Sequence, residues 1–358
     1  MKGCSRRMSR FDHVALLALV TAESSPDIRA SSLIPFISDK ILIVVLPVAV
    51  YWFFSLIFQA CDDNGWLSKY KLHTPEEFLK RNRIRKRDVI QGVLIQHVLQ
   101  VVVGIGLAYF EPDEIVNEQQ NIVTWVQRIQ LGKEYLPSLF AITGIDLLSL
   151  AEKVNLPAQC ASAVGFAGWQ VAVAKTIYYV LIPAFQYALA AFFVDSWQYG
   201  IHWCMHKNRW LYRTFHYRHH QLYVPYAFGA LYNHPLEGFV QDTIGSLLAF
   251  RVAQLSIRQG IYFFTFATLK TVDDHSGFLL PWDPLQLFTD NNALYHDIHH
   301  QSWGMKTNFS QPFFSFWDRV FGTIWKGSDT GIRYERGRQL AKQAHVLEIE
   351  GVANGSSE

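Results

Sequence analysis

The sequence predicts an all-α integral membrane protein, in which about four transmembrane or re-entrant helices are capped by a cytosolic histidine-rich helical domain. Three observations support this fold class. Half of the 358 residues are apolar, the mean hydropathy is +0.07 and only 17% of residues are charged, against roughly 25% in typical soluble proteins. Several long runs carry no charge, and ten of the 14 histidines lie between positions 202 and 300. The net charge of +2 is too small to indicate a nucleic-acid partner.

The uncharged runs predict the membrane spans. Residues 41–60 and 89–110 carry no charge, and a helix of about 20 such residues is about 30 Å long, enough to cross a bilayer core. A third run covers residues 176–194. The fourth region, residues 238–270, is interrupted by Arg251, and each half is too short to cross alone. We therefore expect a re-entrant or tilted helical hairpin there.

Loop charges predict the orientation, because Lys and Arg concentrate on the cytosolic side. Residues 61–88 carry eight basic residues and are assigned to the cytosol. Residues 111–164 carry seven acidic and three basic residues and are assigned to the lumen. The third span then returns the chain to the cytosol, so the histidine-rich segments face the cytosol. The 40 N-terminal residues, placed in the lumen, carry six bases and four acids and weakly oppose this plan.

The segments outside the spans have simpler patterns. The N-terminal segment is expected to be mobile or to lie on the membrane surface, although its apolar residues 14–22 could form a short signal segment. Thr74 and Glu77 have the spacing of a capping box, which predicts a helix start on the cytosolic leaflet. The last thirty residues are polar and are expected to form a mobile tail.

The histidines recur at helical spacing. The pattern H-x-x-H-H occurs twice, in "FHYRHHQ" and "YHDIHHQ", and residues at i, i+3 and i+4 share one face of a helix. Imidazoles one turn apart can bind the same metal ion. The candidate ligands are His202, His206, His216, His219, His220, His234, His275, His296, His299 and His300.

So many imidazoles exceed what one ion can use, so two ions are expected. The absence of a paired cysteine motif disfavours structural zinc, and neutral imidazoles suit iron, copper or zinc. The neighbouring apolar helices favour iron, since a metal centre at the bilayer surface suits oxidation of a lipid chain. A metal transporter is the alternative from another class, but it would place its ligands at the bilayer midplane, whereas these lie in charged segments beyond the spans.

Other residues near the histidine patterns could support the ligands. Carboxylates that could orient the imidazole rings are Asp195, Glu237, Asp273, Asp274 and Asp297; each could equally be a surface acid or a helix cap. Four further histidines have simpler explanations. His97 is expected to pack in the core, and His13, His73 and His345 are expected at the surface or in the tail.

The order of these motifs resembles the fatty acid hydroxylase superfamily of integral-membrane di-iron enzymes. The resemblance rests on H-x3-H, H-x2-HH, the histidine of "NHP" and the second H-x2-HH, and covers about residues 175–326. Within that superfamily, "DDHSGFLLPWDP" and "YHDIHHQSWGMKTNFSQPFFSFWDRVFGT" look like the sphinganine C-4 hydroxylases (sphingoid base hydroxylases). "LIPFISDKILIVVLPVAVYW" is similar to their fungal branch.

The resemblance implies two iron ions held by the ten histidines named above, in a membrane of the endoplasmic reticulum with the active site facing the cytosol. It implies hydroxylation by dioxygen at C-4 of a sphingoid base or ceramide, with electrons from NADPH or NADH through cytochrome b5 and its reductase. A sterol methyl oxidase or an aldehyde-forming relative with the same metal centre remains the alternative enzyme. No fused cytochrome b5 segment is recognisable, so a separate donor is expected.

The resemblance also suggests two surfaces. The basic residues between the first two motifs could dock an acidic electron donor or bind anionic membrane lipids; they are Lys207, Arg209, Arg213 and Arg218. Aromatic residues could line the path of the alkyl chain or simply pack; they are Phe263, Phe264, Phe266 and Phe278. The chain then divides into an N-terminal segment, a transmembrane region, a di-iron hydroxylase domain and a polar C-terminal tail, at residues 1–40, 41–194, 195–326 and 327–358.

Overall fold

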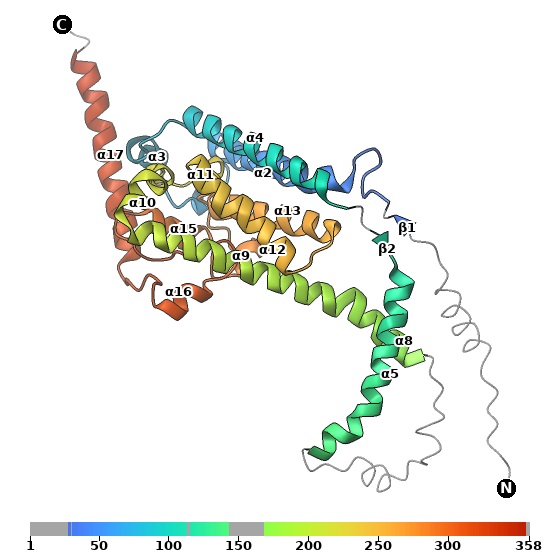
Figure 1. Ribbon diagram of the computed structural model, residues 1–358. Coiled ribbons are helices and arrows are strands. Elements are labelled where there is room, and N and C mark those ends of the chain that lie inside the picture. Colours follow the sequence, from blue (N-terminus) through green and yellow to red (C-terminus); the bar gives the residue numbers. More distant parts are fainter. Residues whose placement is uncertain (1–27, 30, 113–114, 143–167, 356–358) are drawn as a thin grey trace, which may run out of the picture. The chain divides into compact units, whose positions relative to one another are not determined.

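The computed structural model describes residues 28–29, 31–112, 115–142 and 168–355 (Figure 1). The N-terminal apolar stretch 14–22, His13 and the second part of the acidic loop, residues 143–164, lie outside the described residues. The chain forms two compact units. One comprises Met1–Ser31 with Pro112–Gln186, and the other Ser32–Glu111 with Tyr187–Glu358.

The all-α prediction is confirmed, since the secondary-structure elements of the described residues are helices apart from one pair of two-residue strands. In the smaller unit, β1 (Ile28–Arg29) pairs antiparallel with β2 (Ile115–Val116), followed by α5 (Glu118–Ile142), α8 (Gly168–Thr176) and the π-helical η2 (Ile177–Leu181). The larger unit contains α2 (Asp39–Asp63), η1 (Ser68–Tyr70), α3 (Pro75–Arg81), α4 (Lys86–Phe110), α10 (Arg209–Thr214), η3 (His216–Gln221), η4 (Ala227–Gly229), α11 (Pro235–Gly238), η5 (Phe239–Ile244), α12 (Gly245–Val252), α13 (Ile257–Asp274), α14 (Pro284–Leu287), α15 (Ala293–His300), α16 (Phe316–Phe321) and α17 (Thr330–Gly355). Helix α9 (Ile182–Lys207) runs into it from the smaller unit.

Three helices of the described chain are long and apolar enough to cross a membrane. They are Asp39–Asp63, Lys86–Phe110 and the 39-residue run Trp169–Lys207, and they contain the three predicted spans. The chain is therefore a multi-pass membrane protein. The fourth region holds two helices, η5–α12 and α13, joined by a tight turn in which Gln254 has φ of 51°. A helical hairpin is thus present, while its depth in the bilayer stays a prediction.

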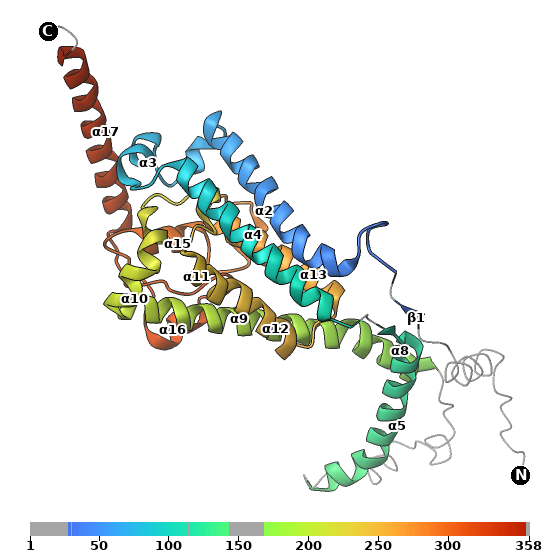
Figure 2. The ribbon, with the colours of Figure 1, turned by 45° about the horizontal axis from the view of Figure 1, so that its top comes forward.

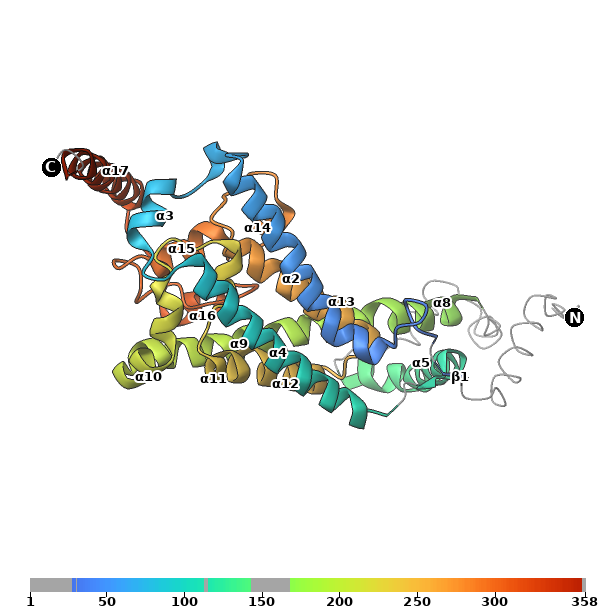
Figure 3. The ribbon, with the colours of Figure 1, turned by 90° about the horizontal axis from the view of Figure 1, so that it is seen from above.

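The long helices pack closely through small residues. Helix α13 lies along α2 (Figures 2 and 3), where Leu42 meets Ile257 and Ile261 in a buried cluster. Gly260 permits this approach, because a Cβ there would lie 2.6 Å from Cδ1 of Ile43. Without a strong hydrophobic drive between helices in lipid, such close backbone packing supplies much of the association energy.

The C-terminal segment differs from the expected mobile tail. Residues Thr330–Gly355 form helix α17, which packs against α3, and Tyr334 and Ala341 are buried on one of its faces. These two residues are two helical turns apart, a spacing that the otherwise polar composition conceals. Helix α3 itself begins with the predicted capping box between Thr74 and Glu77.

Candidate metal centre

Nine of the ten candidate histidines form two groups at one end of the long helices, where α3, α10 and α15 gather (Figures 1 and 2). Within each group, one ring nitrogen from every residue lies within 4.8 Å of all the others. The first group consists of His202, His206, His216, His220 and His299, and the second of His219, His275, His296 and His300.

Each H-x-x-H-H segment contributes to both groups. Segment η3 is a 3-10 helix that gives His216 and His220 to the first group and His219 to the second. Helix α15 does the reverse, with His299 in the first group and the other two histidines in the second. The first group is completed by the two histidines one turn apart on α9 and the second by His275, which follows α13. The two groups therefore interlock.

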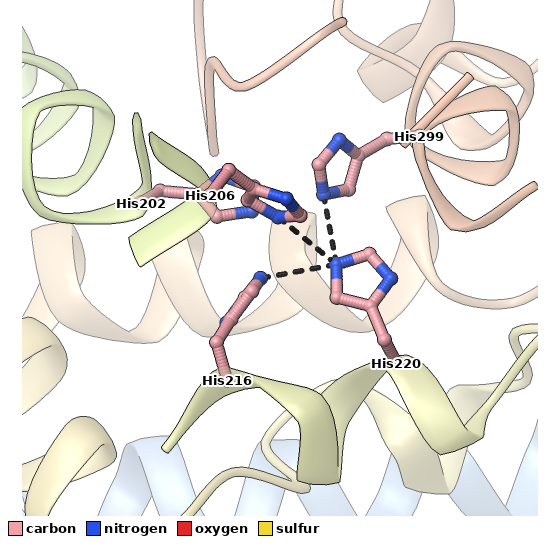
Figure 4. Close-up of side chains that lie close together, drawn as sticks. All are labelled: His202, His206, His216, His220 and His299. Carbon is pink, nitrogen blue, oxygen red and sulfur yellow. Dashed lines mark hydrogen bonds between the residues drawn. The ribbon is translucent and has the colours of Figure 1, made fainter. Parts of the chain in front are cut away.

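Nitrogen spacings within the first group suit a shared ion (Figure 4). The Nε2 atom of His220 lies 3.0 Å from that of His216 and 3.1 Å from those of His206 and His299. In the second group, Nε2 of His300 lies 3.0 Å from Nε2 of His296. Two nitrogens held at right angles about 2.1 Å from one ion would be about 3.0 Å apart. These short spacings are those expected between ligands of one metal ion.

The opposite ring nitrogens hold the rings in place. In six of these histidines Nδ1 lies within hydrogen-bonding distance of an acceptor that has no hydrogen of its own, so Nδ1 carries the proton and the Nε2 lone pair points into the group. The acceptors are the carbonyl oxygens of Phe309 for His202, Thr307 for His299, Leu222 for His300, Thr271 for His275 and Tyr232 for His219, and the Glu237 carboxylate for His216, at 2.6–3.2 Å.

Burial keeps these rings in the ligand form. Loss of solvation lowers the pKa of His216, His219 and His275 to about 3, because a low-dielectric site disfavours the imidazolium. Burial, helped by neighbouring histidines, also holds the pKa of His300 well below its usual range. The Nε2 atom of His275 is buried and has no hydrogen-bond partner among the described residues. Such a buried lone pair without a hydrogen-bond donor is available to bind a metal ion.

His234 stands outside both groups. Its Nδ1 accepts a hydrogen bond from the backbone N–H of Leu236 over 3.2 Å and caps the short helix α11. Its ring packs edge-on against Phe215. The "NHP" histidine thus has a structural role in this arrangement, and Pro235 follows it in the first helical turn.

Of the five candidate carboxylates, Glu237 hydrogen-bonds to a group histidine. The other four find different partners among the described residues. Asp195 accepts from the backbone N–H groups of Phe313 and Phe314, Asp273 accepts from Gln286, Asp274 pairs with Lys270, and Asp297 contacts His73, Gln301 and Tyr334. The orienting carbonyl oxygens escaped sequence reasoning because a main-chain acceptor leaves no signature in residue type.

His73 is buried, not at the surface as expected from the sequence. It lies between two carboxylates, with Nδ1 3.1 Å from Glu77 and Nε2 3.0 Å from Asp297. Burial alone would lower the pKa of His73, but the charges and hydrogen bonds of Asp297 and Glu77 outweigh it and raise the pKa to about 9. His97 is buried in α4, as expected, where its ring packs edge-on against Tyr51.

Three of the four basic docking candidates are exposed. Lys207 ends α9, directly after His206, and Arg209 and Arg213 lie on α10. Arg218 differs, because it is half-buried with its guanidinium 4.8 Å from the centre of the Tyr232 ring. The exposed part of this surface therefore consists of Lys207, Arg209 and Arg213.

Two adjoining cavities lie beside the histidines, and one of them is lined by histidine rings. An apolar cavity of about 210 Å³ is lined by α2, α4, α9, α12 and α13, including Phe263 and Phe264. A polar cavity of about 30 Å³ is lined by histidines of both groups. The two share the lining residues Gln198, Leu231, Asp242, Thr271 and Pro312. Phe266 and Phe278 line neither; Phe266 is half exposed and Phe278 packs on Phe58.

Comparison with known proteins identifies relatives that match most of the chain. The family described as fatty acid hydroxylase matches residues 187–323. The chain is 40% identical to the sphingolipid C4-hydroxylase SUR2 of Saccharomyces cerevisiae, over 88% of this chain and 81% of that protein. It is 40% identical to sphinganine C4-monooxygenase 1 of Arabidopsis thaliana, over 80% and 88%. It is 37% identical to the very-long-chain aldehyde decarbonylase GL1-9 of Oryza sativa subsp. japonica, over 80% and 90%. No solved structure matches the chain.

Proposed function

The chain belongs to the fatty acid hydroxylase family, and we propose that it is a membrane di-iron monooxygenase that hydroxylates C-4 of a long-chain sphingoid base. The observation that carries the proposal is the polar cavity lined by histidines of both interlocked groups, which shares five lining residues with the apolar cavity. The relatives named for sphingolipid C4-hydroxylation and sphinganine C4-monooxygenation supply the substrate class and the position of attack.

The dimensions of the apolar cavity suit one alkyl chain. Helix α4 and its C-cap residue Glu111 line the cavity from His97 onward, over a length of about 21 Å at about 1.5 Å per residue. One leaflet of the bilayer core is about 15 Å thick. The far end of the cavity is polar, where Arg251 pairs with Glu111 over 3.1 Å. The length of the cavity thus suits a long saturated chain between the helices, and we place the polar end of that chain at the histidines, where the polar cavity adjoins.

Each histidine group is assigned one iron, since imidazole nitrogen is a ligand that ferrous iron accepts. When bound, the irons would activate dioxygen with two electrons and two protons, so that one oxygen atom enters the C–H bond and the other leaves as water. The chain's own part is placement. Carbonyl oxygens and Glu237 fix the rings, and burial of the histidines excludes water from the reacting carbon.

The electrons would come from cytochrome b5 and its reductase. Lys207, Arg209 and Arg213 form an exposed basic surface that begins one residue after His206, and an acidic donor would bind there by charge complementarity. Residues 195–326 would then form the di-iron domain on the cytosolic face of the endoplasmic reticulum membrane. This orientation follows from the basic loop between the first two spans.

The proposal is tested by expressing the chain in cells that lack sphingoid C-4 hydroxylation and measuring long-chain bases by mass spectrometry. Trihydroxy bases should appear, and purified protein should contain about two irons per chain. Because one relative is named as an aldehyde decarbonylase, shortened alkanes are measured in the same extracts. Alkanes or oxidised sterols without trihydroxy bases would contradict the proposal.

A further inference from the structure

Several hydrogen-bond acceptors that line the polar cavity have no donor among the described residues. Glu237 Oε2, Gln241 Oε1 and Asp242 Oδ2 are buried and accept no hydrogen bond from the described residues. All three side chains line this cavity, and those of Glu237 and Gln241 belong to residues only 2% and 5% exposed. Buried acceptors in native proteins are almost always satisfied. The cavity is therefore built for a ligand that brings N–H or O–H groups.

Charge distinguishes Asp242 from the other acids of the cavity. Asp274 also lines it but is paired with Lys270. Glu237 accepts from His216, so a metal ion on that histidine would lie close to its charge. Asp242 contacts only the amide of Gln198, over 3.4 Å, and no cation pairs with it among the described residues. An ionised carboxylate in such surroundings is stabilised by a cationic partner.

Asp242 also stands where the two cavities meet, since it lines both. A molecule whose chain lies in the apolar cavity and whose head lies in the polar cavity must pass this side chain. We propose that Asp242, together with Gln241, binds the protonated amine and hydroxyl groups of the sphingoid base, so that the enzyme takes the free base and rejects its N-acylated form. The inference rests on the proposed function and names its substrate.

The chemistry of the substrate fits this placement. In a sphingoid base the amine is at C-2 and hydroxyls are at C-1 and C-3, so C-4 is the first carbon beyond the polar head. A head held at Asp242 brings C-4 next to the histidines that line the same cavity, His216, His275 and His296. An N-acyl amide is uncharged and offers one N–H.

The decisive experiment compares Asp242→Asn with the wild type on sphinganine and on N-acetylsphinganine, using the iron-loaded full-length chain in lipid nanodiscs. The wild type should prefer sphinganine. Asp242→Asn should lower kcat/KM for sphinganine about 10- to 100-fold, as expected for loss of a charge-assisted hydrogen bond, mainly through KM. Its kcat/KM for N-acetylsphinganine should change little. The control is Thr243→Val, on the same π-helical segment but lining only the apolar cavity, which should leave the substrate ratio unchanged.

An equal loss on both substrates, or a wild type that uses them equally, would overturn the assignment of Asp242. A second measurement does not depend on the variant. In the wild type, 1-octadecylamine should inhibit at a lower concentration than 1-octadecanol, and equal inhibition would also overturn it. Gln241→Leu should lower kcat/KM for sphinganine less than Asp242→Asn does. A wild type that hydroxylates neither substrate refutes the proposed function itself, whereas hydroxylation without discrimination refutes only this inference.

Discussion

The Nδ1 atom of His216 and the Oε1 atom of Glu237 are 2.6 Å apart, the shortest of the contacts that orient the group histidines. Glu237 lies in α11, which continues directly into η5 with Gln241 and Asp242, so one short helical stretch both fixes a ring and lines the polar cavity. The Glu237 carboxylate thereby connects the candidate metal centre to the polar cavity.

Replacing Glu237 by Ala should weaken metal binding, because His216 loses the acceptor that fixes its ring. Outer partners of metal-bound histidines are typically worth about 10- to 100-fold in affinity. Iron retained per chain after dialysis against a graded chelator series measures this directly, without reference to turnover. Glu335→Gln, an exposed residue of α17, is the control. Unchanged iron retention in Glu237→Ala would show that the contact does not support the metal.

His299→Ala should abolish trihydroxy-base formation while the protein level holds. It removes a ring nitrogen 3.1 Å from that of His220 at the centre of the first group. The loss should exceed about 100-fold, since even outer partners are worth up to that amount.

The matched control is His234→Ala, because His234 caps α11 and belongs to neither group. That variant should lose about 1 kcal/mol of stability through the cap and keep its iron. The assignment of ligands fails if His299→Ala still yields normal product, or if His234→Ala loses iron while it remains folded.

The buried ion pair at His73 predicts that stability depends on pH. Its pKa in the folded protein is about 9, above the ordinary value of 6.5, so the stabilisation is complete below pH 6.5 and is lost as the pH rises through 9. The difference is on the order of 3 kcal/mol.

Thermal unfolding in detergent at pH 6.5 and pH 9.5 measures this effect. The wild type should unfold at a lower temperature at the higher pH, and His73→Gln should reduce the difference. His345→Gln, on α17, serves as the comparison. Equal unfolding temperatures for the wild type at both pH values would mean that His73 is uncharged in the fold.

The far end of the apolar cavity predicts chain-length selection. Ala108 lines the cavity near Glu111, so Ala108→Phe should fill the space that the last carbons of a long chain would occupy. We expect kcat/KM for C18 and C20 bases to fall about 10-fold or more relative to C14, since several buried methylenes at about 0.8 kcal/mol each would be lost. Val98→Phe on the exposed face of α4 is the control. No change in the C18 to C14 ratio would place the chain elsewhere.

The sequence predicted the helical class, the three spans and the approach of the histidines, because apolar runs and helical spacing are written directly in residue order. It did not predict which histidines of each H-x-x-H-H would join which group. That division depends on the 3-10 geometry of η3 and on how η3 faces α15, about 80 residues away. His73 was misplaced for a similar reason, since its partner Asp297 is 224 residues distant. Helix α17 was missed because its few apolar residues give a weak period.

The interlocking of the two histidine groups has a consequence for how the protein takes up metal ions. Because η3 and α15 each supply rings to both groups, a shift of either segment would alter both groups at once. Metal binding by the two groups should accordingly be cooperative. Protein with both groups occupied and protein with neither occupied should outnumber protein with only one group occupied. Loss of either H-x-x-H-H motif would disrupt both histidine groups, so neither motif could be lost in evolution without loss of the whole centre.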